Sequence, residues 1–158
     1  MIIRRASIKD LERVNELLRQ VLEVHASGRP DIFMSGSKKY TDEELLAIFE
    51  NDETPVFVAE DEALGVVGYA FCIVKEICGS HILHDRRELY IDDLCVDEKC
   101  RGKHIGTALF RFVEDFAKIE GFDAVTLNVW ALNESAMRFY EKCGFKPLKT
   151  VMEKPLGE

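Results

Sequence analysis

A chain of 158 residues that is 47% hydrophobic is long enough for one sizeable core and too short for two comfortable domains, so we expect a single domain over residues 1–158. The formal net charge of −8 argues against general affinity for nucleic acid, which requires a basic surface to neutralise phosphates. The acidic balance suits cationic partners better, although it serves solubility equally well.

The cysteines and the apolar runs bear on the compartment. The five cysteines form no Cys-x-x-Cys pair and have no obvious His–Cys ligand spacing, so neither a metal site nor a disulfide framework is expected. The basic N-terminus is followed by no apolar segment, and the longest apolar run, residues 63–74, is shorter than the ~18 residues of a membrane helix. We therefore expect a cytoplasmic protein without a membrane segment.

The N-terminal half predicts one strand and two helices. Residues 2–3 begin a short strand, and residues 7–10 resemble a capping box that opens a helix. Apolar residues then recur at helical spacing until Gly28 and Pro30, which oppose continuation of the helix. A second cap at residues 41–44 opens a shorter helix, and the segment between the two helices is irregular.

The C-terminal half predicts a strand-rich region followed by alternating helices and strands. Residues 56–59 and 66–74 predict an antiparallel hairpin, and residues 89–96 predict the next strand. Residues 105–117 carry apolar side chains on one helical face, with Gly121 as a C-terminal stop. The pattern then predicts a strand, a short helix and a final strand, at residues 125–129, 135–141 and 145–152. This order is typical of a mixed sheet covered by helices.

The most informative segment, Arg101 to Gly106, lies between a predicted strand and a predicted helix. The first turn of a helix leaves backbone N–H groups unpaired, and the helix dipole favours an anion there. Gly102 allows close approach of the backbone, and Lys103 adds positive charge. The segment therefore predicts a phosphorylated ligand, although neither a P-loop nor a complete dinucleotide-binding fingerprint is present.

A second motif, Asn133 followed by Ala136 to Phe145 (AMRFYEKCGF), makes the pattern specific. A strand, Arg-Gly-Lys-x-Ile-Gly at a helix start, another strand, Asn, and Ala-x-x-Phe-Tyr-Glu-Lys-x-Gly-Phe together resemble the GNAT superfamily of acyl-CoA-dependent N-acetyltransferases. The match is dense from about Tyr90 to Phe145, whereas the N-terminal half agrees only in the order of its elements. The resemblance implies an α/β (α+β) fold with a mixed, mostly antiparallel twisted sheet of about six to seven strands, about four flanking helices and a splayed central strand pair.

The resemblance also implies acetyl-CoA as the acyl donor and assigns residues to it. Its pantetheine arm would pair with the main chain of Leu94, Cys95 and Val96. Asn133 and Lys142 would contact the cofactor. Its pyrophosphate would be held by the loop of Arg101, Gly102, Lys103, His104, Ile105, Gly106 and Thr107.

One position departs from the family pattern. The pattern Gln/Arg-x-x-Gly-x-Gly/Ala has a glycine where this chain has His104. Because an N–H group in the first turn of a helix needs no positive φ, we expect His104 to keep the amide donor and to place an imidazole near phosphate. A solvent-facing histidine without a role is the alternative.

The implied reaction is direct attack of a primary amine, on a small molecule, peptide or protein, on the thioester. A lysine-like amine has a pKa of about 10.4, so it needs a base or a water path. On an alternating strand only one of Asp92 and Asp93 can face the acceptor, and we prefer Asp92 as the base by resemblance, with a solvated acid as the alternative. The backbone N–H of Val96 would stabilise the oxyanion, and Tyr140 would protonate the leaving thiolate unless it only fills the core.

Several further assignments stay open. The irregular segment between the first two helices often lines the acceptor pocket in this family, and its candidates are His25, Arg29, Asp31 and Phe33; the alternative is that they are surface or cap residues. A ping-pong route through Cys95 or Cys100 is a less favoured mechanism. A non-catalytic acyl-CoA-binding sensor is the competing function, and a homodimer is a family-level expectation.

Overall fold

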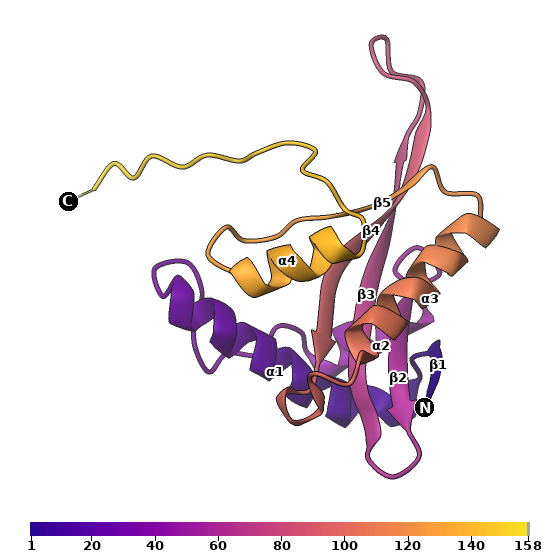
Figure 1. The fold of residues 1–158 in the computed structure, drawn as a ribbon, viewed down its shortest axis with the longest axis vertical. Coiled ribbons are helices and arrows are strands. Elements are labelled where there is room, and N and C mark those ends of the chain that lie inside the picture. The colour runs from indigo at the N-terminus through magenta and orange to yellow at the C-terminus, as the bar shows by residue number, and fades with distance from the viewer. Residues whose placement is uncertain (158) are drawn as a thin grey trace. The chain divides into compact units, whose positions relative to one another are not determined.

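The computed structural model describes residues 1–157 as two units, Met1–Asn128 and the part of the chain from Val129 onward, which we describe separately. The first unit contains a five-stranded sheet in the order β1-β2-β3-β4-β5 (Figure 1). The strands are β1 Ile2–Arg5, β2 Val56–Asp61, β3 Gly65–Ile77, β4 Arg86–Val96 and β5 Ala124–Leu127. Neighbours are antiparallel except β4 and β5, which are parallel. This mixed, mostly antiparallel sheet confirms the predicted fold class.

Helices flank the sheet in the first unit, and a further helix forms the second. The first unit contains α1 Leu11–Gly28, α2 Asp42–Glu50 and α3 Ile105–Ile119, and the second contains α4 Glu134–Lys142. Short 3₁₀ turns precede α1 and follow β4 at Ile8–Asp10 and Glu98–Cys100. No helix within residues 1–157 has both the length and the apolarity that crossing a membrane requires.

The alternation of β2 shows how the helices cover the two faces of the sheet. Val56 and Val58 belong to the core cluster that also contains apolar residues of α1 and α2. Phe57 lies between them in sequence and contacts the rings of Phe112 and Phe116 on α3, with centroids 5.0 and 5.1 Å apart. Since successive strand residues point to opposite faces, α1 and α2 pack on one face of β2 and α3 packs on the other.

Local capping signals place the helices where the sequence predicts them. The Asp10 carboxylate accepts a hydrogen bond from the backbone N–H of Ser7 at 2.9 Å. At the second predicted cap, Thr41 Oγ1 accepts from the Glu44 N–H at 3.2 Å, and the Glu44 carboxylate accepts from the Thr41 N–H at 3.0 Å. α1 ends at Gly28 as expected.

The number of strands differs from the expectation of about six to seven. The predicted final strand at residues 145–152 has no regular structure in the part of the chain that the structure describes. The described part of the second unit contains the helix α4 and no strand, so this segment has no ladder partner within its own unit. Pro147 also removes one backbone donor from it. A β-like residue pattern does not form a strand without a neighbour.

Candidate functional site

The strand β4 continues beyond the end of its partner β5. The parallel pairing runs from Glu88 with Ala124 to Ile91 with Leu127. Residues 92–96 of β4 therefore have β3 on one side and no β5 partner on the other, which we call the open edge of β4. This geometry agrees with the splayed strand pair that the resemblance implies.

Two peptide units on the open edge point away from β3. The backbone N–H of Asp97 donates to Val67 O at 2.9 Å, which fixes the phase of the antiparallel ladder. Hydrogen-bonded and non-hydrogen-bonded pairs alternate in such a ladder, so Cys95 bonds to β3 while Leu94 and Val96 direct their N–H and C=O groups outward. The open edge thus offers backbone donors and acceptors to an extended ligand.

The loop after β4 leads these backbone groups to the start of α3. Arg101 Nε donates to Val96 O at 3.4 Å, which ties the loop to the end of the strand. Gly102 has φ of 79°, and α3 begins at Ile105 with no side-chain hydrogen bond capping its first turn. An uncapped helix N-terminus beside Arg101 and Lys103 fits an anionic group such as a phosphate.

His104 occupies a left-handed backbone conformation, with φ of 60° and ψ of 17°. Among residues 1–157 it is the only non-glycine residue with positive φ. The expectation that this position needs no positive φ is therefore wrong, because His104 is the N-cap that precedes the helical turn. The left-handed region costs a non-glycine residue about 1–2 kcal/mol, which explains why the family pattern has glycine at this position.

Two adjacent carboxylates of β4, Asp92 and Asp93, have different partners. Lys39 Nζ lies 3.2 Å from Asp92 Oδ2, and the Tyr69 hydroxyl donates to Asp93 Oδ2 at 2.8 Å. The register shifts between Phe71, opposite Asp93, and the next β3 residue, opposite Ile91, so Asp92 is the extra residue of a β-bulge. We expected only one of Asp92 and Asp93 to face the acceptor because strand residues alternate, and the bulge interrupts that alternation. Lys39 interacts electrostatically with both acids.

Burial dominates the electrostatics of this site. It raises the pKa of Asp93 above the usual range, while the Lys39 ammonium and the Tyr69 hydroxyl act in the opposite direction. Burial and the neighbouring Asp93 also raise the pKa of the Tyr69 hydroxyl, which therefore stays neutral. Burial raises the pKa of the Cys95 thiol to about 12, so this sulfur is a thiol at neutral pH and a poor nucleophile for a ping-pong route.

The irregular segment divides its predicted acceptor residues into two groups. The His25 and Phe33 rings lie with centroids 5.0 Å apart and planes tilted by 39°, and an interaction with His25 acts to lower the pKa of Asp93. Arg29 pairs instead with Asp31, at 2.7 Å between Nη2 and Oδ2. The His25 interaction thus links this segment to an acid of β4.

Sequence reasoning missed three residues of this site: Lys39, Tyr40 and Tyr69. Tyr69 lies within a predicted strand, and Lys39 and Tyr40 lie at the end of the predicted irregular segment, where nothing in the sequence distinguishes them. Tyr40 stacks on Phe71 of β3 with centroids 6.2 Å apart, and Lys39 Nζ lies 5.3 Å from the Tyr40 ring centroid. No local sequence pattern predicts contacts between positions so far apart in the chain.

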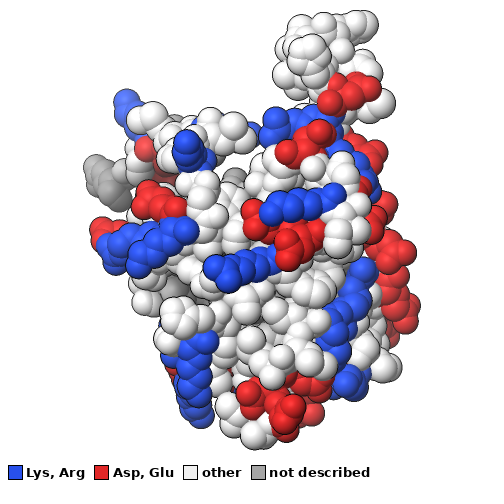
Figure 2. All heavy atoms as spheres, turned by 45° about the vertical axis from the view of Figure 1, so that its right-hand side comes forward, with Lys and Arg blue, Asp and Glu red and all other residues white. Residues whose placement is uncertain are grey.

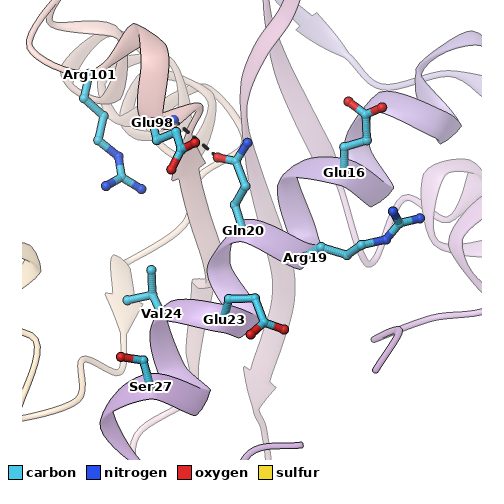
Figure 3. Close-up of a pocket in the computed structure, with 8 residues that line it drawn as sticks. All are labelled: Glu16, Arg19, Gln20, Glu23, Val24, Ser27, Glu98 and Arg101. Carbon is cyan, nitrogen blue, oxygen red and sulfur yellow. Dashed lines mark hydrogen bonds between the residues drawn. The ribbon is translucent and has the colours of Figure 1, made fainter. Parts of the chain in front are cut away.

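A cavity of about 510 Å³ lies between α1 and the loop that follows β4 (Figure 3). The Glu98 backbone N–H donates to Gln20 Oε1 at 3.3 Å across it. Its lining residues are Glu16, Arg19, Gln20, Glu23, Val24, Ser27, Glu98 and Arg101.

Figure 2 shows acidic and basic side chains interspersed on the visible face rather than gathered by sign. No group of three or more potential metal ligands occurs within residues 1–157.

Within the second unit, residues of the C-terminal motif cap α4 and pack their aromatic rings together. Asn133 caps α4, with its Oδ1 accepting from the Ala136 N–H at 3.2 Å. The half-buried Tyr140 ring lies 5.2 Å from Phe139 and 5.6 Å from Phe145, measured between centroids. The cofactor contacts expected of Asn133, Tyr140 and Lys142 remain predictions that rest on the resemblance.

Similarity to known proteins extends over most of the chain. The sequence model of the acetyltransferase (GNAT) family matches residues 18–145. An uncharacterized N-acetyltransferase of Methanocaldococcus jannaschii is 31% identical over 150 residues, which are 94% of this chain and 80% of the relative. The probable N-acetyltransferase camello of Xenopus laevis is 42% identical over 59 residues, which are 37% of this chain and only 27% of the relative.

A solved structure shares the fold over nearly the whole chain. The high-resolution X-ray structure of a tetramutant of a Bacillus halodurans protein has a TM-score of 0.94 to this chain at 35% identity, with 99% of this chain and 100% of the other covered. An open β4 edge followed by a glycine-containing loop and a helix N-terminus is the arrangement that the resemblance implies for this fold. The chain belongs to the acetyltransferase (GNAT) family.

Proposed function

We propose that the protein is an N-acetyltransferase that transfers the acetyl group of acetyl-CoA directly to a primary amine. The open edge of β4 carries this proposal, because it joins three features along one stretch of backbone. Carboxylates lie at its start, outward backbone groups at Leu94 and Val96 follow, and the Arg101–Thr107 loop with the α3 N-terminus lies at its end. The relatives named N-acetyltransferases support the same reaction class.

The donor end uses mainly backbone. The outward groups of Leu94 and Val96 would pair with the pantetheine amides, and the N–H groups at the start of α3 would bind the pyrophosphate with Arg101 and Lys103 beside them. Acetyl-CoA supplies a thioester carbonyl that is activated toward amines. The Val96 N–H is our candidate donor to the oxyanion that forms on this carbonyl. By resemblance, Asn133 and Lys142 would assist in binding, and Tyr140 would protonate the leaving thiolate.

The acceptor end uses side chains. Asp93 is our preferred proton acceptor, because burial raises the pKa of its carboxyl toward the working range of a base. The Tyr69 hydroxyl holds this carboxylate in place at 2.8 Å. Asp92, the base suggested by the resemblance, is engaged by Lys39 and is the alternative. The cysteines are free thiols, which suits the reducing cytoplasm that we propose as its location.

The test is acceptor-dependent release of free thiol. Purified protein is incubated with acetyl-CoA and a panel of primary amines, and calorimetry measures acetyl-CoA affinity in parallel. We expect thiol release that depends on the amine and on the protein. Tight acetyl-CoA binding without thiol release in the presence of any amine would instead support an acyl-CoA sensor. Absence of both binding and release would mean that this chain does not use acetyl-CoA.

A further inference from the structure

Lys39 brings a positive charge from a distant segment into the acidic part of the candidate acceptor site. Its Nζ lies 3.2 Å from Asp92 Oδ2, and the two residues are 53 positions apart in sequence. The Lys39 side chain is 40% exposed and that of Asp92 is 29% exposed, so the pair is accessible from solvent but partly desolvated. Tyr40, stacked on Phe71, lies under the same ammonium.

Asp93 is held in a different way. Its carboxylate accepts from the Tyr69 hydroxyl, which is neutral, while the Lys39 ammonium that pairs with Asp92 also attracts it. The cluster of Lys39, Asp92 and Asp93 thus contains two acids and one ammonium. When Asp93 is ionised, one negative charge remains for an incoming cation.

We propose that Lys39 neutralises Asp92, leaves Asp93 as the one acid that receives the acceptor ammonium, and so makes the site prefer acceptors with a single positive charge over diamines. This inference rests on the proposed acetyl transfer. A second ammonium on the acceptor would have no acid to meet and would approach the Lys39 ammonium instead. Repulsion between two ammonium groups a few ångströms apart near a protein surface is enough to select between acceptors.

The groups around the cluster come from every element packed on it. His25 of α1 and Lys39 act to lower the pKa of Asp93, whereas Asp92 acts to raise it. Tyr40 and Tyr90 carry phenols whose pKa is raised chiefly by burial, so they remain neutral beside Asp92. Burial likewise raises the pKa of the nearby thiols of Cys72 and Cys95 to about 12. Lys39 is therefore the permanent cation of this set.

The decisive experiment compares Lys39→Gln with Lys38→Gln. Lys38 is the adjacent lysine, 44% exposed, and pairs with Asp42 rather than with the β4 acids, at 2.5 Å. The probes are n-butylamine and 1,4-diaminobutane, which share a carbon chain and differ by one ammonium group. Their affinities are measured by NMR titration, and their kcat/KM values by thiol release. We expect the diamine-to-monoamine ratio to rise about tenfold in Lys39→Gln, by its Coulomb energy, and to stay unchanged in Lys38→Gln and Lys39→Arg.

A second readout requires no turnover. Carboxyl ¹³C NMR gives the pKa of Asp93, and this pKa should rise in Lys39→Gln because the nearby ammonium that lowers it is gone. An unchanged ratio in Lys39→Gln, or the same rise in Lys38→Gln, would overturn the inference. If no amine is acetylated by the wild-type protein, the proposed function fails, and the affinity ratio still decides whether Lys39 sets the charge preference.

Discussion

The proposed donor end of the open edge of β4 consists mainly of backbone groups, whereas the proposed acceptor end consists of side chains. The donor end consists of outward peptide groups at Leu94 and Val96 and of an uncapped helix start, with contacts between residues close in sequence. The acceptor end consists of side chains from α1, the irregular segment before α2, β3 and β4, held by contacts such as that between Lys39 and Asp92. A backbone site recognises any ligand of the right shape and charge, whereas a side-chain site is free to vary. We therefore expect the proposed acceptor end to set specificity.

We expect the largest effect from a substitution that disrupts the acceptor end alone. Asp93→Asn removes the proposed base, and we expect kcat to fall by about 10²-fold or more. The affinity for acetyl-CoA should change little, because the donor end consists of backbone. Steady-state kinetics and calorimetry measure the two quantities. Asp115→Asn, an exposed acid on α3, is the matched control. Parallel losses of kcat and acetyl-CoA affinity would contradict the separation of the two ends.

A second change breaks the donor end. Gly68 of β3 lies opposite Val96, and a Cβ at this position would be 2.7 Å from Cys95 O and 3.1 Å from Leu109 Cδ1. Gly68→Ala must displace β4, so we expect a loss of about 1–3 kcal/mol in the free energy of unfolding and weaker acetyl-CoA binding. Urea denaturation and calorimetry check both. Gly157→Ala, with no atom in reach of its Cβ, is the control, and wild-type values for Gly68→Ala would disprove the close approach.

His104 sharpens the view that backbone rather than side chain carries donor binding. Because its φ is 60°, replacement by glycine should leave the protein about 1–2 kcal/mol more stable than replacement by alanine. His104→Asn should fall near the wild type, since asparagine tolerates this conformation. Thermal or urea unfolding ranks the three variants. Acetyl-CoA affinity should be retained in His104→Gly; a large loss would give the imidazole a direct role, and a gain would mark it as a hindrance.

The smallest expected effect is the pH dependence of stability. Burial raises the pKa of Asp93, so the folded protein binds this proton more tightly than the unfolded chain. The contribution of Asp93 is therefore complete below its unfolded pKa of about 3.9 and is lost as the pH rises through its folded pKa. Urea unfolding between pH 4 and 7 should show the stability of wild type falling relative to Asp93→Asn. Parallel profiles for the two proteins would contradict a raised pKa.

Local chemistry explains which parts of the fold were predictable. The cap at Thr41 and Glu44, the stop at Gly28 and the hairpin of β2 and β3 all depend on neighbouring residues, and each formed as expected. The final strand at residues 145–152 needed a partner that its own sequence does not specify, and it did not form in the described chain.

The site shows the same division. The loop that begins at Arg101 was recognisable because its glycines and basic residues are adjacent in sequence. The bulge at Asp92 and the reach of Lys39 to it depend on the register of β3 and on the course of the irregular segment. The left-handed conformation of His104 was missed because histidine there conceals the requirement that glycine would have revealed.

The most direct test of the open-edge account is amide hydrogen exchange with and without acetyl-CoA. The N–H groups of Leu94 and Val96 point away from β3, whereas that of Cys95 already bonds within the ladder. The account predicts that acetyl-CoA slows exchange at Leu94 and Val96 and leaves Cys95 nearly unchanged. Equal protection of all three amides, or no protection at Leu94 and Val96 under saturating acetyl-CoA, would contradict it.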